Sequence, residues 1–300
     1  MMTSLSSRFP SPRAWLIGVR PPTLGLSLVP VFLGTALAVH QGAPMQWGAF
    51  LMASLCVLLI QAGTNLFNDV GDGVRGADGP GRLGPVRLIG SGQASARQVR
   101  NAAILCFVLA LLGGLWLASH HGPAITVIGI CSLLAGWLYS GGPRPLSHTP
   151  WGESCVLLFF GIIAVAGSHY LQMGQWSLLA MLFGLVPGCH AAAVLLVNNT
   201  RDLVNDMQAG RRTLAAVLGE GGARILYAVL LLAPFVLLLV LSMVFKLPGL
   251  ILAPLLALPA AGVLIFLFTV RRGRALNTQL KQTALLQAVI ALLILWVLLI

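Results

Sequence analysis

Long apolar runs, broken by short polar segments, dominate the chain from about position 22 to its end. Each run holds roughly 20 residues, which is the length that an α-helix needs to cross the hydrocarbon core of a membrane. No ten-residue alternation indicates a β-barrel, and an open strand would leave backbone donors unpaired in lipid. The pattern therefore predicts an all-α, polytopic membrane protein with nine transmembrane helices, at residues 22–40, 47–67, 101–119, 123–141, 154–171, 177–198, 223–245, 248–270 and 282–300.

Charge is scarce and unevenly distributed. The chain is 58% hydrophobic and 8% charged, whereas an ordinary soluble domain is about 25% charged. Arginines and lysines cluster before the first run and after the second, fourth, sixth and eighth, and only Lys246 falls on the other side. Loops rich in these residues stay in the cytoplasm. We therefore expect an inner-membrane protein with a cytoplasmic N-terminus and a periplasmic C-terminus, and the net charge of +11 predicts no nucleic-acid partner.

Several familiar motifs are missing or stand in the wrong context. The five cysteines form no C-x-x-C pair and no ligand-spaced cluster with the six histidines, so no zinc site is predicted. Gly71, Gly73 and Gly76 match G-x-G-x-x-G, but they end a membrane helix instead of following a strand, which excludes a dinucleotide site. The pair Gly184 and Gly188 predicts close helix packing. The N-terminal segment lacks a signal peptide's apolar core, so the first run is expected to remain in the mature chain.

All five aspartates fall in two short segments at the ends of apolar runs. NLFNDVGDGVRGAD begins at Asn65 and closes the second run, and NNTRDLVNDMQAG begins at Asn198 and closes the sixth. Spacings of i, i+4 and i+7 place each set of polar residues on one helix face. The sets are Asn65, Asp69 and Asp72, and Asn198, Asp202 and Asn205 with Asp206 beside them. Simple solvation of the loops is the alternative, but several other loops carry no carboxylate at all, so a site is predicted here.

The two segments also resemble each other. Their Asn and first Asp align at a constant offset of 133 positions. We interpret this as a weak internal repeat of about four helices, covering 22–141 and 154–270, within a single transmembrane domain of residues 1–300. Repeats in membrane proteins let two half-sites face each other across a central cavity.

Two acidic helix faces repel each other unless cations lie between them. Carboxylate oxygen is the hard ligand that Mg²⁺ prefers, and Mg²⁺ commonly shares its ligand shell with substrate phosphates. Arginines in the same segments, among them Arg75, Arg87, Arg201 and Arg211, offer forked donors to phosphate oxygens. The apolar runs beneath would accommodate a hydrocarbon tail. These features together predict an isoprenoid diphosphate as ligand.

At these residues the chain resembles the intramembrane aromatic prenyltransferases of the UbiA superfamily, and within it the branch that prenylates 1,4-dihydroxy-2-naphthoate for menaquinone. The resemblance covers most of the chain. The first helix, RPPTLGLSLVPVFLGTALA, the loop RLGPVRLIGSG and the loop YSGGPRPLSHTPWGE are similar to that branch. The two Asp segments carry the specific part of the match.

The resemblance implies a nine-helix bundle around a central cavity, with a cytoplasmic cap of two Asp-rich loops. It implies that two Mg²⁺ hold the diphosphate of a polyprenyl donor, and that the naphthoate ring attacks the resulting allylic cation. The ring carbon attacked bears the carboxyl group, which leaves as CO₂, and the product is demethylmenaquinone. The implied metal ligands are Asn65, Asp69, Asp72, Asn198, Asp202 and Asp206. The implied substrate-binding residues are Asn65, Asn68, Arg75, Arg87, Asn198, Asn199, Arg201 and Arg211.

The chain departs from the superfamily pattern at two positions. Many members carry a third Asp four residues after Asp72, where this chain has Gly76, and the nearest carboxylate is Asp78. The family often has Lys in a GKxTL motif, where this chain has GRRTL, so Arg211 keeps the charge but changes its geometry.

Other polar residues permit a functional and a structural interpretation. The predicted catalytic set is Asp69, Asp72, Asp202, Asp206 and Tyr139. In this set Tyr139 would orient a substrate; the alternative is that Tyr139 anchors its helix at the membrane interface. Glu153 either serves the site or caps a helix, and His190 is expected to pack inside the sixth helix. The alternative functions are a prenyltransferase for 4-hydroxybenzoate, homogentisate or haem, and a cation-coupled transporter. Transport is disfavoured because coupling sites usually lie near the bilayer midplane.

Overall fold

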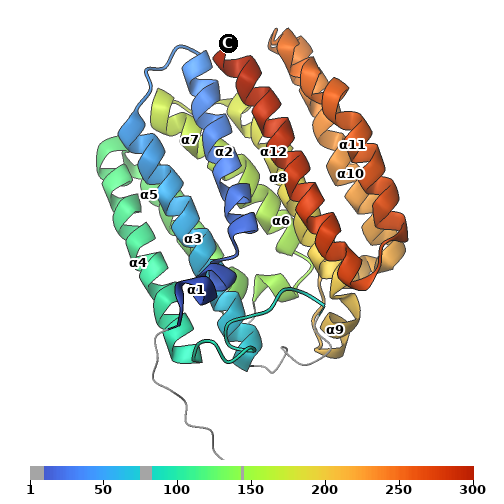
Figure 1. Ribbon diagram of the computed structural model, residues 1–300. Coiled ribbons are helices and arrows are strands. Elements are labelled where there is room, and N and C mark those ends of the chain that lie inside the picture. Colours follow the sequence, from blue (N-terminus) through green and yellow to red (C-terminus); the bar gives the residue numbers. More distant parts are fainter. Residues whose placement is uncertain (1–9, 75–82, 143–144) are drawn as a thin grey trace, which may run out of the picture.

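The computed structural model describes residues 10–74, 83–142 and 145–300, and within these ranges it contains helices and no strand (Figure 1). Nine helical segments there are long and apolar enough to cross a membrane. In chain order they are α2 (Pro21–His40), α3 (Trp47–Val74), α4 (Ala96–His121), α5 (Pro123–Ser140), the composite fifth span of α6 (Gly152–Leu157), η2 (Leu158–Ile163) and α7 (Ala164–Met173), α8 (Leu178–Arg201), α10 (Leu214–Val244), η3 (Pro248–Ile251) with α11 (Leu252–Val270), and η4 (Gly273–Ala275) with α12 (Leu276–Leu299). The short helices are α1 (Pro12–Val19), η1 (Leu146–His148) and α9 (Leu203–Gln208).

The all-α fold and its nine predicted spans are confirmed, but two helices extend well beyond the predicted apolar runs. The second run was expected to end at residue 67, whereas α3 continues to Val74. The seventh was expected to begin at residue 223; α10 begins at Leu214, but Gly219 (φ 66°, ψ 175°) interrupts it, so its continuous part starts close to the predicted residue. The ninth begins at Leu276 instead of residue 282. Helices continue past the apolar stretch because backbone hydrogen bonding and capping set their ends, and hydropathy does not.

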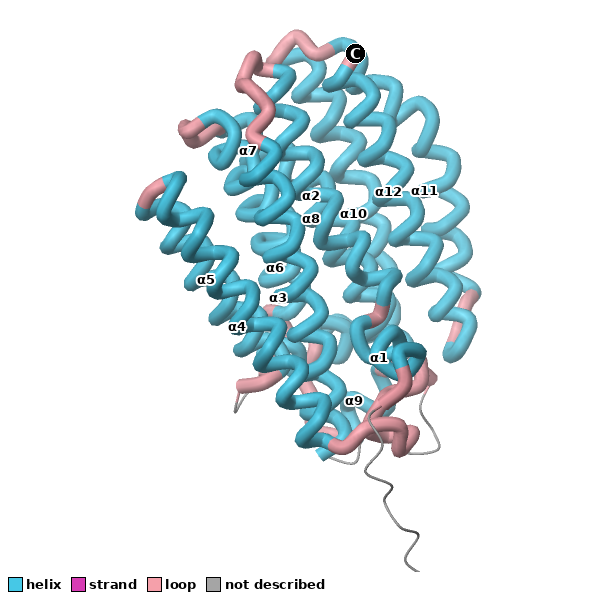
Figure 2. Tube along the Cα trace, turned by 60° about the vertical axis from the view of Figure 1, so that its left-hand side comes forward, coloured by secondary structure: helices cyan, strands magenta, loops and turns pink. Residues whose placement is uncertain are grey.

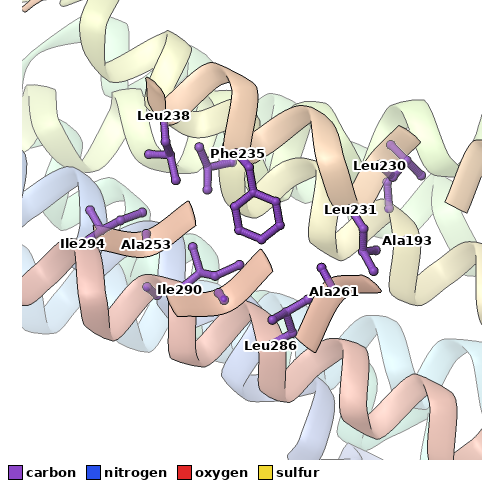
Figure 3. Close-up of a cluster of buried hydrophobic side chains, with 14 of the residues drawn as sticks. Ala193, Leu230, Leu231, Phe235, Leu238, Ala253, Ala261, Leu286, Ile290 and Ile294 are labelled. Carbon is purple, nitrogen blue, oxygen red and sulfur yellow. The ribbon is translucent and has the colours of Figure 1, made fainter. Parts of the chain in front are cut away.

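Helix α8 forms the centre of the bundle. It is the most buried span, with 72% of its most hydrophobic window inside the molecule, and it packs against α10, α12 and the π-helical segment η2. Leucine, isoleucine and alanine side chains of α10, α11 and α12 surround Phe235 in the largest apolar cluster (Figure 3). Because other helices enclose α8, the polar C-terminal end of α8 has a fixed position.

Glycines let α8 approach the fifth span closely. A Cβ atom added at Gly188 would lie 2.7 Å from the carbonyl oxygen of Leu157, and one added at Gly184 would lie 2.6 Å from the Cα atom of Ile162. On the other side of the contact, a Cβ at Gly161 would lie 2.4 Å from the carbonyl oxygen of Gly184. The predicted packing role of the Gly184 and Gly188 pair is therefore confirmed.

We expect Gly188→Leu to lower the melting temperature of the detergent-solubilised protein by about 2–12 °C. Overpacking a close contact costs about 1–3 kcal/mol, and each kcal/mol shifts the melting temperature by about 2–4 °C in a chain of this size. Gly262→Leu is the matched control, because Gly262 is exposed and an added Cβ meets nothing within 4 Å. Differential scanning fluorimetry measures both. Equal melting temperatures for the two variants would contradict the packing assignment.

Helices α4 and α5 form an outer layer on one side of the bundle (Figure 2). Only 22% and 11% of their hydrophobic windows are buried, and large side chains such as Leu112, Leu115 and Val127 are exposed. Exposed apolar side chains over whole helices are typical of contact with lipid. The inner faces of these two helices help to enclose the cavity described next.

Candidate functional site

Both Asp segments lie at one end of the bundle, which we call the Asp end. Asp69 and Asp72 lie in the last turns of α3, Asp202 is the C-cap of α8, and Asp206 lies in α9. Helices α1 and α9 mark this end in Figure 1, and the C-terminus lies at the opposite end. The sequence predicted Asp-rich loops, whereas the described aspartates belong to helix ends, since α3 and α8 continue beyond their apolar stretches.

A cavity of about 400 Å³ opens between α2, α3, α4, α5, the fifth span and α8. Polar side chains gather where it reaches the Asp end: Arg20, Asn65, Asn68, Tyr139 and Asn198 all line it there. The four described aspartates of the predicted set are absent from its lining, and the sole charged side chain that lines it among the described residues is Arg20.

Away from the mouth the cavity wall is largely apolar. Along α3 its lining runs from Asn68 to Ala53, which is roughly 22 Å at 1.5 Å per residue. Phe159 and Phe160 of the π-helical segment also line it. A narrow apolar space of this length suits an extended hydrocarbon chain.

Asp72 joins the two Asp segments through ion pairs. Its carboxylate is 3% exposed and contacts the guanidinium groups of Arg87 and Arg211, with 2.7 Å from Oδ1 to Nη2 of Arg211. Arg211 also lies 3.3 Å from Oδ1 of Asp206. Arginine thus bridges a carboxylate of α3 and a carboxylate of α9, which are far apart in the sequence. The predicted meeting of the two segments is observed at this bridge.

Arg201 organises the second Asp segment. Its guanidinium donates to both carboxylate oxygens of Asp202, at 2.9 and 2.5 Å, and to the side-chain oxygens of Asn198 at 2.8 Å and Asn277 at 2.7 Å. Asn277 in turn donates to the carbonyl of Leu83 at 2.9 Å. The end of α8 is therefore tied to the start of α12 and to the segment that follows α3.

Asp69 is directed away from the cavity mouth. Its buried carboxylate accepts hydrogen bonds from the backbone N–H groups of Leu88 at 2.9 Å and Ile89 at 3.2 Å. The turn that it holds carries Arg87, whose guanidinium also donates to the carbonyl of Asn68 at 2.6 Å. Asp69 thereby fixes the position of Arg87 against Asp72.

Asn65, Asn199, Tyr139 and Glu153 occupy supporting positions. The amide of Asn65 donates to the carbonyl of Val19 at 2.9 Å, and the amide of Asn199 donates to the buried Glu153 carboxylate at 2.8 Å. Tyr139 lines the mouth of the cavity. His190 is fully buried and its Nδ1 lies 2.8 Å from the carbonyl of Val186, so it packs inside α8 as expected.

Carboxylates at the Asp end lie close to one another in a poorly solvated space. Burial raises the pKa of Asp206 to about 6; the Arg211 guanidinium lowers this pKa, and the charges of Asp202 and Asp72 raise it further. A buried carboxylate that faces like charges keeps its own charge only when cations are near. Positive charge is therefore required at the point where the two segments meet.

The donor atoms at this point suit Mg²⁺, since they are hard carboxylate and amide oxygens. In the described parts of the chain no three His, Cys, Asp or Glu side chains come together as a ready metal cluster, because the carboxylates contact arginines. Arg75 and Asp78 lie outside the described residues. The fit is one of chemistry: carboxylates of the kind that bind Mg²⁺ are paired with guanidinium groups of the kind that bind phosphate.

Comparison with known proteins identifies the family at this point. Residues 27–293 match the model of the UbiA prenyltransferase family. The chain belongs to this family. A 1,4-dihydroxy-2-naphthoate octaprenyltransferase of Mycobacterium tuberculosis is 38% identical over 280 residues, which cover 93% of this chain and 94% of that protein. The protein of the same name from Escherichia coli is 37% identical over 75% of this chain and 74% of its own length.

Solved structures of UbiA proteins share the fold at low sequence identity. A UbiA homolog from Archaeoglobus fulgidus bound to GPP and Mg²⁺ superposes with a TM-score of 0.69, covers 96% of this chain and all of its own, and is 16% identical. The same homolog bound to DMAPP and Mg²⁺ gives 0.68. The nine-span architecture of this UbiA chain is thus the architecture of its family.

Arg20 and Thr23 are the site residues of this UbiA chain that the sequence did not reveal. Arg20 counted only among the cations that set topology, yet its side chain lines the cavity mouth together with Thr23. Its position directly before two prolines at the start of the first span was the available signal, because Pro21 and Pro22 fix a helix start there.

Proposed function

We propose that this UbiA protein transfers a polyprenyl group from a polyprenyl diphosphate to 1,4-dihydroxy-2-naphthoate, with loss of CO₂, to give the demethylmenaquinone skeleton. The observation that carries the proposal is the Asp72–Arg211–Asp206 bridge at the mouth of a long apolar cavity. The names of the relatives from Mycobacterium tuberculosis and Escherichia coli support the choice of acceptor.

The donor diphosphate lies at the Asp end in this proposal, and its tail lies in the cavity. Asp72, Asn198, Asp202 and Asp206 would hold Mg²⁺ there, while Asn65 and Asp69 keep neighbouring segments in place. A solved UbiA homolog with the same fold was bound to GPP and Mg²⁺, which supports the combination of a prenyl diphosphate with Mg²⁺. When bound, Mg²⁺ supplies positive charge that stabilises the departing diphosphate.

The arginines of the site exchange partners when the donor binds. Arg87 and Arg211 contact Asp72 in the structure, and forked guanidinium donors match phosphate oxygens equally well. Together with Arg201, and with Arg75 beyond the described residues, they bind the diphosphate oxygens as charge develops on them. Two asparagines add polar groups around the diphosphate: Asn68 lines the cavity mouth, and Asn199 lies beside Glu153.

Bond changes follow from this placement. The allylic carbon–oxygen bond of the donor breaks, and the electron pair leaves with the diphosphate. The largely apolar wall keeps water from the allylic cation. The ring carbon that bears the carboxyl group attacks, the new carbon–carbon bond forms, and the carboxyl carbon leaves as CO₂ with its bonding electrons returned to the ring. Tyr139 lies at the mouth, where it orients the acceptor ring.

The proposed orientation in the inner membrane follows from charge. The Asp end carries arginines of the segment between α3 and α4, including Arg87, and those beside α8 and α9, including Arg201 and Arg211. Cationic loops remain in the cytoplasm. The Asp end with the N-terminus therefore faces the cytoplasm, where soluble isoprenoid precursors and the aromatic acid are available, and the C-terminus faces the periplasm.

A comparison of acceptors tests the proposal. Membranes containing the protein, supplied with Mg²⁺ and a polyprenyl diphosphate, are expected to prenylate 1,4-dihydroxy-2-naphthoate with a kcat/KM at least about tenfold above that for 4-hydroxybenzoate, a difference of about 1.4 kcal/mol. Product mass and released CO₂ are measured. If 4-hydroxybenzoate is preferred, the chain belongs to another acceptor branch. If neither acid is prenylated, transport becomes the leading alternative.

A further inference from the structure

Arg20 has a backbone conformation that non-glycine residues rarely adopt. It joins α1 to α2 with φ 54° and ψ 72°, and among the described residues Lys246 is the other non-glycine residue with a positive φ. Such a conformation is unfavourable for a residue with a Cβ atom and persists where its surroundings impose it.

Side chains on both sides of the bend hold it in place. Thr23 donates to the Arg20 carbonyl from its backbone N–H and from its hydroxyl, each at 2.9 Å. The Asn65 amide donates to the Val19 carbonyl at 2.9 Å and to the Thr23 hydroxyl at 3.0 Å. Asn65 therefore connects the α1–α2 junction to the first Asp segment, and the position of Arg20 is fixed relative to that segment.

The bend places the Arg20 side chain in the cavity wall. Among the described residues that line the cavity, Arg20 is the sole charged one. The arginines of the Asp network, Arg87 and Arg211, are absent from that lining and contact Asp72. A single guanidinium in an otherwise uncharged wall favours an anionic group inside the cavity, because its forked donors fit a carboxylate.

We propose that Arg20 binds the carboxylate of the aromatic acceptor inside the cavity, which rests on the function proposed above. The Asp network occupies the outer part of the site and accounts for the diphosphate. An acceptor acid must approach the allylic carbon from the cavity side, where Arg20 is the described cation. Once the carboxyl group has left as CO₂, the product has no anion for Arg20 to hold, and this favours its release.

A pair of inhibitors that differ only in charge tests the proposal. 2-Naphthoate and 2-naphthamide have nearly the same shape, but only the first carries a carboxylate. The unmodified enzyme is expected to bind 2-naphthoate at least about tenfold more tightly, as measured by inhibition constants against 1,4-dihydroxy-2-naphthoate. Arg20→Gln is expected to bring the ratio of the two constants close to one, and Arg20→Lys is expected to retain part of the preference.

Arg20→Gly keeps the test decisive if Arg20→Gln folds poorly. Glycine accepts a positive φ without strain, so this variant is expected to melt no lower than the unmodified protein and still to lose the charge preference. The KM for the polyprenyl diphosphate is expected to change less than about threefold in every variant. An unchanged inhibitor ratio, or a selective rise in the KM for the donor, would overturn the proposal and assign Arg20 to the diphosphate. Failure of the unmodified protein to prenylate the naphthoate would instead refute the proposed function.

Discussion

Asp72→Asn is expected to lower the rate of prenyl transfer by about a hundred- to a thousandfold while the protein still inserts and folds. The substitution keeps the size and one acceptor oxygen but removes the charge that pairs with Arg87 and Arg211. Loss of about 3–4 kcal/mol of transition-state stabilisation gives a fall of this size. Single-turnover rates at saturating Mg²⁺ measure it.

Two further variants test whether the effect is specific to the Asp segments. Asp202→Asn is expected to cause a fall of similar size, because Asp202 occupies the corresponding helix end of the second segment. Glu220→Gln is the matched control: Glu220 is a half-exposed carboxylate that pairs with Arg224 and Arg272, so its loss is expected to leave the rate within about twofold. Near-full activity of both Asp variants would mean that the aspartates only solvate helix ends.

Arg211→Gln is expected to lower kcat/KM for the polyprenyl diphosphate by roughly a hundredfold, which corresponds to about 3 kcal/mol. Arg211 is the cation that joins Asp72 to Asp206, at 2.7 and 3.3 Å. Its removal leaves the buried carboxylates of Asp72 and Asp206 with less compensating positive charge, and it takes away a forked donor for the diphosphate. Steady-state kinetics at several donor concentrations separate KM from kcat.

The neighbouring arginine supplies the control for Arg211. Arg212 is exposed, and its backbone N–H donates to the carbonyl of His148, so Arg212→Gln is expected to retain kcat/KM within about threefold. Arg211→Lys keeps the charge without the fork and is expected to fall between the two. Equal effects of Arg211→Gln and Arg212→Gln would show that only the summed charge of the loop matters.

The nine spans were predictable from the sequence because the length of an apolar run reports the thickness of the membrane core. Helix ends were less predictable. Hydropathy falls where polar residues begin, but α3 continues to Val74 and carries Asp69 and Asp72 as helical residues. Because the helix continues, the two carboxylates point in different directions and contact different partners.

The register of the first Asp segment could not be read from spacing alone. Asn65 with Asp69 and Asn68 with Asp72 both satisfy i, i+4. The contacts distinguish them: Asp69 holds the backbone of Leu88 and Ile89, whereas Asp72 joins the second segment through Arg211. Tertiary hydrogen bonds leave no trace in periodicity, so this division of roles between Asp69 and Asp72 could not be predicted from spacing.

Arg20 shows a second limit of sequence reasoning. Its charge was visible, and it was counted as a topology signal with the other cations. Its place in the cavity wall depends on a positive φ that Thr23 and Asn65 hold, through hydrogen bonds at 2.9 to 3.0 Å. A backbone conformation that residue type disfavours cannot be predicted from residue type.

The proposed function requires the two Asp segments to act on one diphosphate together with Mg²⁺. Calorimetric titration of the purified protein with a non-reactive donor, geranyl S-thiolodiphosphate, tests this requirement. The unmodified protein is expected to bind the analogue with Mg²⁺ and to lose measurable binding after chelation. Asp72→Asn and Asp202→Asn are each expected to weaken binding, and the double variant by less than the combined single effects, because the residues share one site. Equally tight binding after chelation, or an Asp variant that binds like the unmodified protein, would contradict the proposed function.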